Sequence, residues 1–436
     1  MVGTIGICLG LIAGFMFMSV VDTVLEHRAS PRLHDKQLPG STASLTDQQA
    51  DTTSEQLTVT ADGKVLPVAL TDSSMGAASA SKGRSIHTLC TSNGSPYLNY
   101  QTRIMYGTYQ MIQKAAGGDQ HVAFTRILHR SEPDILMTQV PSFRADPLTP
   151  ACDTWCEFPV SDRPNAVRQF FDAAVKDASL IQAPWLLMIE TDYVWMKPLQ
   201  APQAEDMAAS SLAFPFGYIN PQYPNIEGVM RKMYPAEKGP LTNVPGSGPA
   251  PVMMRLAEWI KVTPDWERLT AHIEADPESK EKLGWVREMY AFSVALALQG
   301  IKVDLAKPPL NPLITQPPAD ATLGQAAMFH YTWGSVFQNA QGEKAWEFDK
   351  RAYTDPSIVT TPPALALPPA FDTQFKLQDG KAVTQELYDT LTAMIQQMNH
   401  AIANLSPLKI QSQPQLHEPE LNFPMQSIVQ SSSTVD

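Results

Sequence analysis

The stretch at residues 185–189, Trp-Leu-Leu-Met-Ile, constrains the fold more than any other part of the sequence. An unbroken apolar run of this length is typical of a strand that is covered on both faces. Further candidate strands at residues 86–92 and 121–129 alternate with candidate helices at residues 97–115 and 163–178. Alternation of strands with helices predicts an α/β domain around a mostly parallel sheet.

Local signals add detail to this outline. Residues 211–216 are a further candidate member of the sheet, and Asp162 stands where it can cap the helix that follows. Separate helices are expected near residues 254–261 and 266–275, and Gly300 marks the end of another. Apolar residues at helical spacing within residues 387–402 predict an amphipathic helix that packs on the body.

The N-terminal end differs in composition from the body. Residues 2–21 are apolar or small except Thr4 and Ser19, and about 20 such residues span a bilayer core of ~30 Å. This length predicts a single uncleaved transmembrane anchor, with a cleaved signal peptide as the alternative. The chain then divides into an anchor at 1–22, a flexible polar stem at 23–84 and a globular body at 85–370. An amphipathic helix region at 371–405 and a disordered tail at 406–436 follow, and the stem contains a candidate hairpin around Asp62-Gly63.

Charge and cysteine content exclude some classes of partner. A net charge of −12 and a pI near 5.2 argue against binding to a nucleic-acid backbone, which needs a concentrated basic surface. The four cysteines have no zinc-site spacing. Cys152 and Cys156 are close enough in sequence to form a disulfide in an oxidising compartment.

Two carboxylates follow the apolar strand at residues 185–189. An extended backbone points Glu190 and Asp192 the same way and turns Thr191 in the opposite direction. Ligands bind beyond the carboxyl ends of parallel strands, and two hard oxygen ligands at that place can hold Mg²⁺ or Mn²⁺, which bridges a diphosphate. The alternative is that these carboxylates pair with Arg or Lys, or cap the next turn.

Other candidate site residues are scattered along the chain. His330 can supply an imidazole ligand to the same ion, although a lone histidine beside aromatic residues is more often a packed one. Glu288 lies within a helix with an apolar side and can serve as a base or orient an acceptor; the alternative is a salt bridge with Arg287 or Lys282. Basic residues within apolar or aromatic segments are candidates for diphosphate contacts: Arg103, Arg126, Arg231, Lys232, Lys350 and Arg351.

Eight segments, taken in order, carry a resemblance to a known family. They are PYLNYQTRIMYGTY, FTRILH, IETDYVWMKPL, AFPFGYINP, GPLTN, GWVREMYAF, FHYTWG and WEFDKRAY. Together they resemble the plant and algal hydroxyproline O-arabinosyltransferases, over about two thirds of the chain. The related peptidyl serine α-galactosyltransferases share a thinner version of the same order.

The resemblance implies a fold, a location and a reaction. It implies a GT-A-like nucleotide-sugar-binding fold, a type II Golgi membrane anchor with a lumenal catalytic domain, and a divalent metal, Mn²⁺ or Mg²⁺. It also implies transfer of L-arabinofuranose from UDP-arabinofuranose to hydroxyproline in Hyp-rich polypeptides, with retained anomeric configuration. By the same resemblance Glu190 and Asp192 form the acid-x-acid metal motif, His330 lies in the HYT segment, Glu288 in the EMYA segment, and Lys350 and Arg351 in the FDKR signature.

The sequence departs from the family pattern in two places. Tyr193 stands where the family commonly has histidine, and residues 244–252 replace a loop that carries Asp and Asn. These departures keep two alternatives open: a peptidyl serine α-galactosyltransferase, and a non-catalytic, membrane-anchored lectin-like scaffold. A polyproline II acceptor strand would dock on aromatic grooves, for which the candidates are Tyr97, Tyr100, Tyr106, Trp285, Tyr290 and Trp333.

Overall fold

The computed structural model describes residues 56–59, 65–68, 83–154, 156–202 and 210–408. The predicted anchor at 1–22, most of the stem and the tail beyond residue 408 lie outside these ranges. Within them, no helix is both long and apolar enough to cross a membrane. In the stem, β1 (Gln56–Val59) and β2 (Val65–Val68) pair antiparallel, as the predicted hairpin requires.

A seven-stranded sheet forms the centre of the body, in the order β10-β8-β9-β6-β3-β4-β5. Its strands are β3 (Ile86–Ser92), β4 (His121–His129), β5 (Ser142–Ala145), β6 (Trp185–Ile189), β8 (Ser211–Ala213), β9 (Val252–Arg255) and β10 (Val303–Asp304). β9 runs antiparallel to both of its neighbours, and all other pairs in the sheet are parallel. The prediction of a mostly parallel sheet is therefore confirmed, and β9 is the one strand that runs in the opposite direction.

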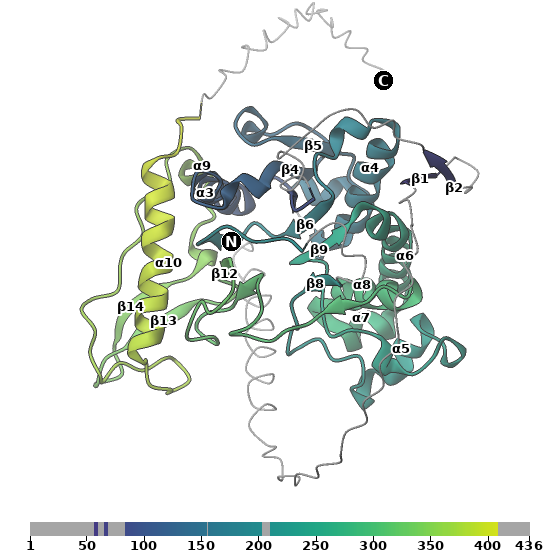
Figure 1. Ribbon diagram of the computed structural model, residues 1–436. Coiled ribbons are helices and arrows are strands. Elements are labelled where there is room, and N and C mark those ends of the chain that lie inside the picture. Colours follow the sequence, from purple (N-terminus) through teal and green to yellow (C-terminus); the bar gives the residue numbers. More distant parts are fainter. Residues whose placement is uncertain (1–55, 60–64, 69–82, 155, 203–209, 409–436) are drawn as a thin grey trace, which may run out of the picture.

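Helices cover both faces of this sheet (Figure 1). The chain passes from β3 through α3 (Pro96–Gln113) to β4, and returns from β5 through α4 (Arg163–Lys176) to β6 on the other side of β3. Because crossovers between parallel strands are right-handed, these opposite directions place α3 and α4 on opposite faces. α6 (Leu256–Ala275) and α8 (Arg287–Leu298) join α4, since Trp259 of α6 contacts Phe171 of α4 and Phe292 of α8.

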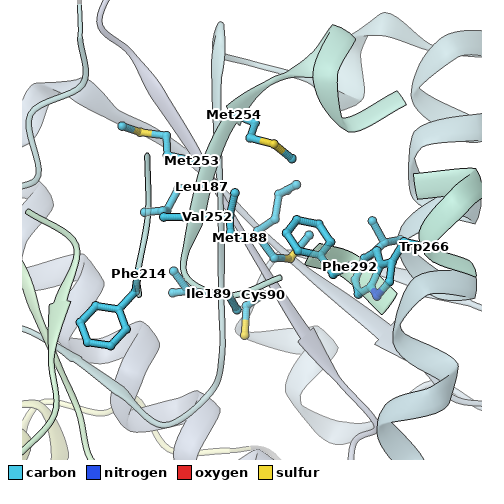
Figure 2. Close-up of a cluster of buried hydrophobic side chains, with 14 of the residues drawn as sticks. Cys90, Leu187, Met188, Ile189, Phe214, Val252, Met253, Met254, Trp266 and Phe292 are labelled. Carbon is cyan, nitrogen blue, oxygen red and sulfur yellow. The ribbon is translucent and has the colours of Figure 1, made fainter. Parts of the chain in front are cut away.

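The main core lies on the central strands. All five residues of β6 are completely buried, as the apolar run at residues 185–189 predicts. Figure 2 shows side chains of β6 and β9 between Phe214 on one side and Phe292 and Trp266 on the other. Large apolar side chains cover both faces of the sheet, so the polar side chains gather at its carboxyl edge.

A second core joins the C-terminal segments to α3. A three-stranded sheet of order β11-β12-β7 contains β11 (Ile314–Thr315), β12 (Met328–His330) and β7 (Tyr193–Trp195). Next to it, β13 (Ser335–Gln338) and β14 (Lys344–Phe348) form a hairpin, and α10 (Gln385–Ala403) stands against α3 at one side of the molecule (Figure 1). α10 buries Leu387, Leu391, Met394, Ile395 and Met398, which confirms the predicted amphipathic helix.

Two local predictions are wrong. The region expected to form two helices is one continuous helix, α6, with Pro264 in its interior, while Met254 belongs to β9. Trp259 and Trp266 are completely buried on either side of the proline, so packing outweighs the backbone hydrogen bond that the proline lacks. Asp162 precedes α4 but makes no capping bond; its Oδ2 instead accepts from the backbone N–H of Thr149.

Other local features agree with the sequence. Gly300, with φ of 64°, follows the end of α8 in the left-handed conformation that favours glycine. Cys152 and Cys156, which the sequence left open as a pair, form a disulfide. Among the described residues, the other α-helices are short: α5 (Glu227–Met233), α7 (Pro277–Leu283) and α9 (Ser357–Thr360).

Candidate active site

The acid-x-acid segment lies at the carboxyl end of β6, in the middle of the central sheet. β6 neighbours β3, and the helices that follow β3 and precede β6 cover opposite faces, so this edge is a topological switch point, where α/β sheets bind ligands. The Thr191 hydroxyl donates to Oε1 of Gln101, on α3, over 2.9 Å. This bond holds the middle residue against α3, while the carboxylates of Glu190 and Asp192 both lie near His330.

Strand pairing brings His330 to these carboxylates. β12 pairs antiparallel with β7, and His330 is opposite Tyr193, the residue that follows Asp192. Nε2 of His330 lies 3.2 Å from Oδ2 of Asp192 and 3.9 Å from Oε2 of Glu190. Each of the three side chains offers a ligand atom within 4.8 Å of the other two. The structure therefore brings together all three predicted metal ligands.

The His330 ring is held in place by neighbouring polar groups. Its Nδ1 lies 3.2 Å from the side-chain amide of Gln316, and the Thr332 hydroxyl lies 2.7 Å from its Nε2. The Tyr193 ring packs on it with centroids 4.6 Å apart. A partner on the nitrogen that faces away from the carboxylates, as Gln316 is, fixes the orientation of a metal-binding imidazole.

Both carboxylates also have cationic partners, which is the alternative that the sequence left open. The Lys350 ammonium, on the 3₁₀ helix Lys350–Ala352, donates to Oδ2 of Asp192. The Arg163 guanidinium lies 2.5 Å from Oε1 of Glu190 and 3.8 Å from Oε2 of Glu288. Three carboxylates and two fixed cations thus form one buried cluster.

The cluster shifts the pKa values of its members. Burial opposes ionisation of Asp192, but the adjacent Lys350 and His330 outweigh it and hold the pKa of Asp192 well below its usual range. For Glu288 burial dominates and raises the pKa to about 7, against the opposing effect of Arg163. Asp192 is therefore a permanent anion at neutral pH, whereas Glu288 exchanges a proton near neutrality.

The side chains present fit a divalent cation. Within the described part of the chain, Oδ1 of Asp192 is buried without a hydrogen-bond partner, although a buried carboxylate oxygen is costly to leave unpaired. Carboxylate oxygens and an imidazole nitrogen are suitable ligands for Mn²⁺ or Mg²⁺. The buried oxygen that lacks a partner and the three converging ligand atoms give such an ion a place.

Glu288 is turned toward this cluster. It lies in the first turn of α8 and is 2% exposed. The two cations that sequence proximity suggested as its partners are engaged elsewhere, Arg287 with Glu274 and Lys282 with Glu278. Glu288 faces Arg163 instead, and its Oε1 has no hydrogen-bond partner among the described residues.

The other basic candidates lie apart from the cluster. Arg103 donates to the backbone carbonyls of Val359, Thr360 and Ser406, which ties two C-terminal segments to α3. Arg126 is completely buried and forms a paired salt bridge with Asp134. Arg351 pairs with Asp349 at the surface. Arg231 and Lys232 also have partners away from the cluster, so of the predicted phosphate-binding residues only Lys350 reaches it.

Sequence reasoning missed Arg163, the residue that links Glu190 to Glu288. Its position did carry a signal, because a cation in the first turn of a helix opposes the helix dipole and therefore implies a carboxylate partner. The sequence also gave no indication of three polar residues that each hold another site residue in place: Gln101, Gln316 and Thr332. Nothing in their local sequence distinguishes them from ordinary polar residues.

Comparison with known proteins identifies the family. The sequence model described as "Hydroxyproline O-arabinosyltransferase family N-terminal domain" matches residues 86–305. Hydroxyproline O-arabinosyltransferase 3 of Arabidopsis thaliana is 34% identical over 314 residues, which cover 70% of this chain and 82% of the relative. Hydroxyproline O-arabinosyltransferase NOD3 of Pisum sativum is 36% identical over 290 residues, or 65% of this chain and 80% of the relative.

Solved structures show weaker similarity. A glycosyltransferase involved in the glycosylation of the major capsid of PBCV-1 has 13% identity and a TM-score of 0.31, and covers 57% of this chain and 93% of its own. The galactosyltransferase LgtC has 9% identity and a TM-score of 0.31, with 63% and 94% coverage.

The family match and the cluster at the carboxyl edge of the sheet define the class of protein, which is a glycosyltransferase. The chain belongs to the hydroxyproline O-arabinosyltransferase family.

Proposed function

We propose that this protein transfers L-arabinofuranose from UDP-arabinofuranose to hydroxyproline residues of Pro- and Hyp-rich polypeptides, with retention of configuration, on a GT-A-like fold. The observation that carries the proposal is the Glu190, Asp192 and His330 cluster at the switch point of the sheet, in a chain of this family. Membership supplies the reaction, and the cluster supplies a place for the diphosphate of the donor.

In this proposal Glu190, Asp192 and His330 hold a divalent cation, Mn²⁺ or Mg²⁺. Such an ion acts as a Lewis acid that stabilises the negative charge of the departing diphosphate. Lys350, which touches Asp192, adds a positive charge on the same side and binds a donor phosphate. Arg163 keeps Glu190 and Glu288 in place, so both carboxylates are positioned before substrate binds.

The transfer breaks the bond between the anomeric carbon and the diphosphate oxygen and forms a bond from that carbon to the hydroxyproline oxygen on the same face. The hydroxyl proton passes to a phosphate oxygen of the leaving UDP. Glu288, with its pKa near 7, orients the acceptor hydroxyl through a hydrogen bond.

The proposal includes a location. The apolar run at residues 2–21 supports a membrane anchor, and membership of the family is the ground for a type II orientation in the Golgi membrane, with the body in the lumen. Fusing residues 1–28 to a fluorescent protein tests this location. A fusion that is secreted would instead support the alternative of a cleaved signal.

The reaction is tested with the full chain, Mn²⁺, UDP-arabinofuranose and a peptide of alternating proline and hydroxyproline. The expected product is the peptide with one or more pentose masses added. A parallel reaction offers UDP-galactose and a serine peptide. Hexose transfer to serine alone would establish the galactosyltransferase alternative, and donor binding without any transfer would establish the non-catalytic scaffold.

A further inference from the structure

Trp285 is the most exposed large hydrophobic side chain in the described part of the chain, at 66%. It lies on the 3₁₀ helix Gly284–Val286, directly before α8. Of the six aromatic residues suggested as an acceptor groove, Tyr100 and Tyr290 are buried and Tyr97, Tyr106 and Trp333 are half-buried. Only Trp285 offers an open aromatic face.

The Trp285 side chain is supported from below. Its ring packs edge-on against Phe158, with centroids 5.3 Å apart and planes at 85°. The Arg287 guanidinium lies 3.4 Å from the centroid of the Phe158 ring, and Glu274 anchors that guanidinium over 2.5 Å. A supported aromatic side chain loses little freedom when a ligand binds, which favours binding.

Two chain segments connect this platform of Trp285 and Phe158 to the candidate active site. Three residues after Trp285 comes Glu288, and five residues after Phe158 comes Arg163. Glu288 and Arg163 face each other across 3.8 Å within the cluster. The same two segments therefore form the platform and part of the site. They touch through Trp285 and Phe158 at the platform and through Glu288 and Arg163 at the site.

We propose that Trp285, supported by the buried Phe158 ring, forms an acceptor subsite, on which a proline or hydroxyproline ring close to the reacting residue stacks. This inference rests on the proposed function. Pro-rich chains adopt the polyproline II helix without help and present flat apolar rings, which dock on aromatic side chains. A hollow of about 420 Å³ beside the platform, lined by Glu157, Glu274, Pro277, Lys280, Glu281 and Arg287, leaves room for the chain beyond.

The spacing fixes which acceptor residue stacks. The 3₁₀ helix rises about 2 Å per residue as far as Val286 and α8 about 1.5 Å per residue after it, so Trp285 lies roughly 5 Å along the chain axis from Glu288. A polyproline II helix rises about 3.1 Å per residue. The stacked ring therefore belongs to a residue about two positions from the hydroxyproline that receives the sugar.

The test compares kcat/KM for two acceptors in the full chain with Mn²⁺ and UDP-arabinofuranose. One acceptor is a single hydroxyproline blocked at both ends, and the other is a nonapeptide with a central hydroxyproline flanked by prolines. Trp285→Ala should lower kcat/KM for the nonapeptide roughly three- to tenfold, the range of an aromatic stacking contact, and leave the single residue unchanged. Trp285→Phe should retain most of the activity, and Leu310→Ala, at another exposed apolar position, should change neither acceptor.

Replacing the proline two positions from the hydroxyproline by alanine should abolish the effect of Trp285→Ala, as expected for two groups in contact. Equal effects of Trp285→Ala on both acceptors, or no effect on either, would overturn the subsite while leaving the transferase intact. A change in oligomeric mass in Trp285→Ala would also overturn it, because the tryptophan would then face a second copy. A wild-type chain that transfers pentose to neither acceptor would overturn the proposed function itself.

Discussion

Nε2 of His330 lies 3.2 Å from Oδ2 of Asp192, although 138 positions separate the two residues in the chain. The contact follows from the antiparallel pairing of β12 with β7, which places His330 opposite Tyr193. A small second sheet thus adds an imidazole to two carboxylates supplied by the central sheet. Asp192 is the carboxylate that contacts both His330 and Lys350, which makes it the critical group of the proposed cation site.

Replacing Asp192 by asparagine should abolish divalent-ion binding and the ion-dependent part of UDP binding. The side chain keeps its shape but loses the charge that a hard cation requires. Calorimetric titration of Mn²⁺, and of UDP with and without Mn²⁺, measures the effect, and we expect at least a tenfold loss of affinity. Asp379→Asn, at an exposed pair with Lys381, is the matched control. Unchanged Mn²⁺ affinity in a folded Asp192→Asn protein would remove the metal assignment.

Lys350 and the cation should compete for Asp192. Because Lys350 donates to Oδ2 of Asp192, Lys350→Met leaves this buried carboxylate with His330 as its remaining partner, and we expect a loss of about 3 kcal/mol in the free energy of unfolding in chelator. Mn²⁺ should then raise the melting temperature of the variant more than that of the wild type, while UDP binds at least tenfold more weakly. Lys344→Met, at an exposed pair, is the control. Equal stabilisation of both proteins by Mn²⁺ would exclude competition at this carboxylate.

Arg163→Met should destabilise the protein by about 3–5 kcal/mol, because it leaves Glu190 and Glu288 without their shared cation. Urea unfolding measures the change. Arg168→Met provides a control on the same helix, and its half-exposed pair with Glu267 should contribute at most about 1 kcal/mol. Glu288→Gln should change the free energy of unfolding less in Arg163→Met than in the wild type, since the contact between the two residues is already absent. Strict additivity of the two changes would show that the residues do not interact.

Much of this structure could be predicted from local patterns, because burial on both faces produces the apolar run of β6 and helix periodicity produces α10. The continuous α6 could not, since Trp259 and Trp266 outweigh Pro264 only once both find their places in the core. The acid-x-acid segment was visible as a candidate, but spacing alone did not separate a cation site from an ion pair. The structure shows an ion pair on one oxygen of each carboxylate, and within the described residues Oδ1 of Asp192 is buried without a hydrogen-bond partner.

For the basic residues, local sequence context suggested the wrong candidates. Arg103 and Arg126 stand in apolar segments just as a phosphate-binding arginine would, yet their donors are occupied by backbone carbonyls and by Asp134. Arg163 was not among the predicted site residues, yet it contacts two of the carboxylates in the cluster. The partner of a buried guanidinium depends on contacts between residues far apart in the chain. A single sequence does not show those contacts.

Glu288 should make stability depend on pH near neutrality. Burial raises its pKa from 4.5 to about 7, so between these values the folded protein holds a proton that the unfolded chain has lost. The free energy of unfolding should therefore fall as pH rises through this window, by about 3 kcal/mol in total, and stay level above it. Urea unfolding in chelator between pH 4.5 and 8 measures the slope. Glu288→Gln should lack this slope and Glu386→Gln, at an exposed position on α10, should keep it. A wild-type protein and a Glu288→Gln variant with parallel profiles would show that Glu288 does not hold a proton in the folded state.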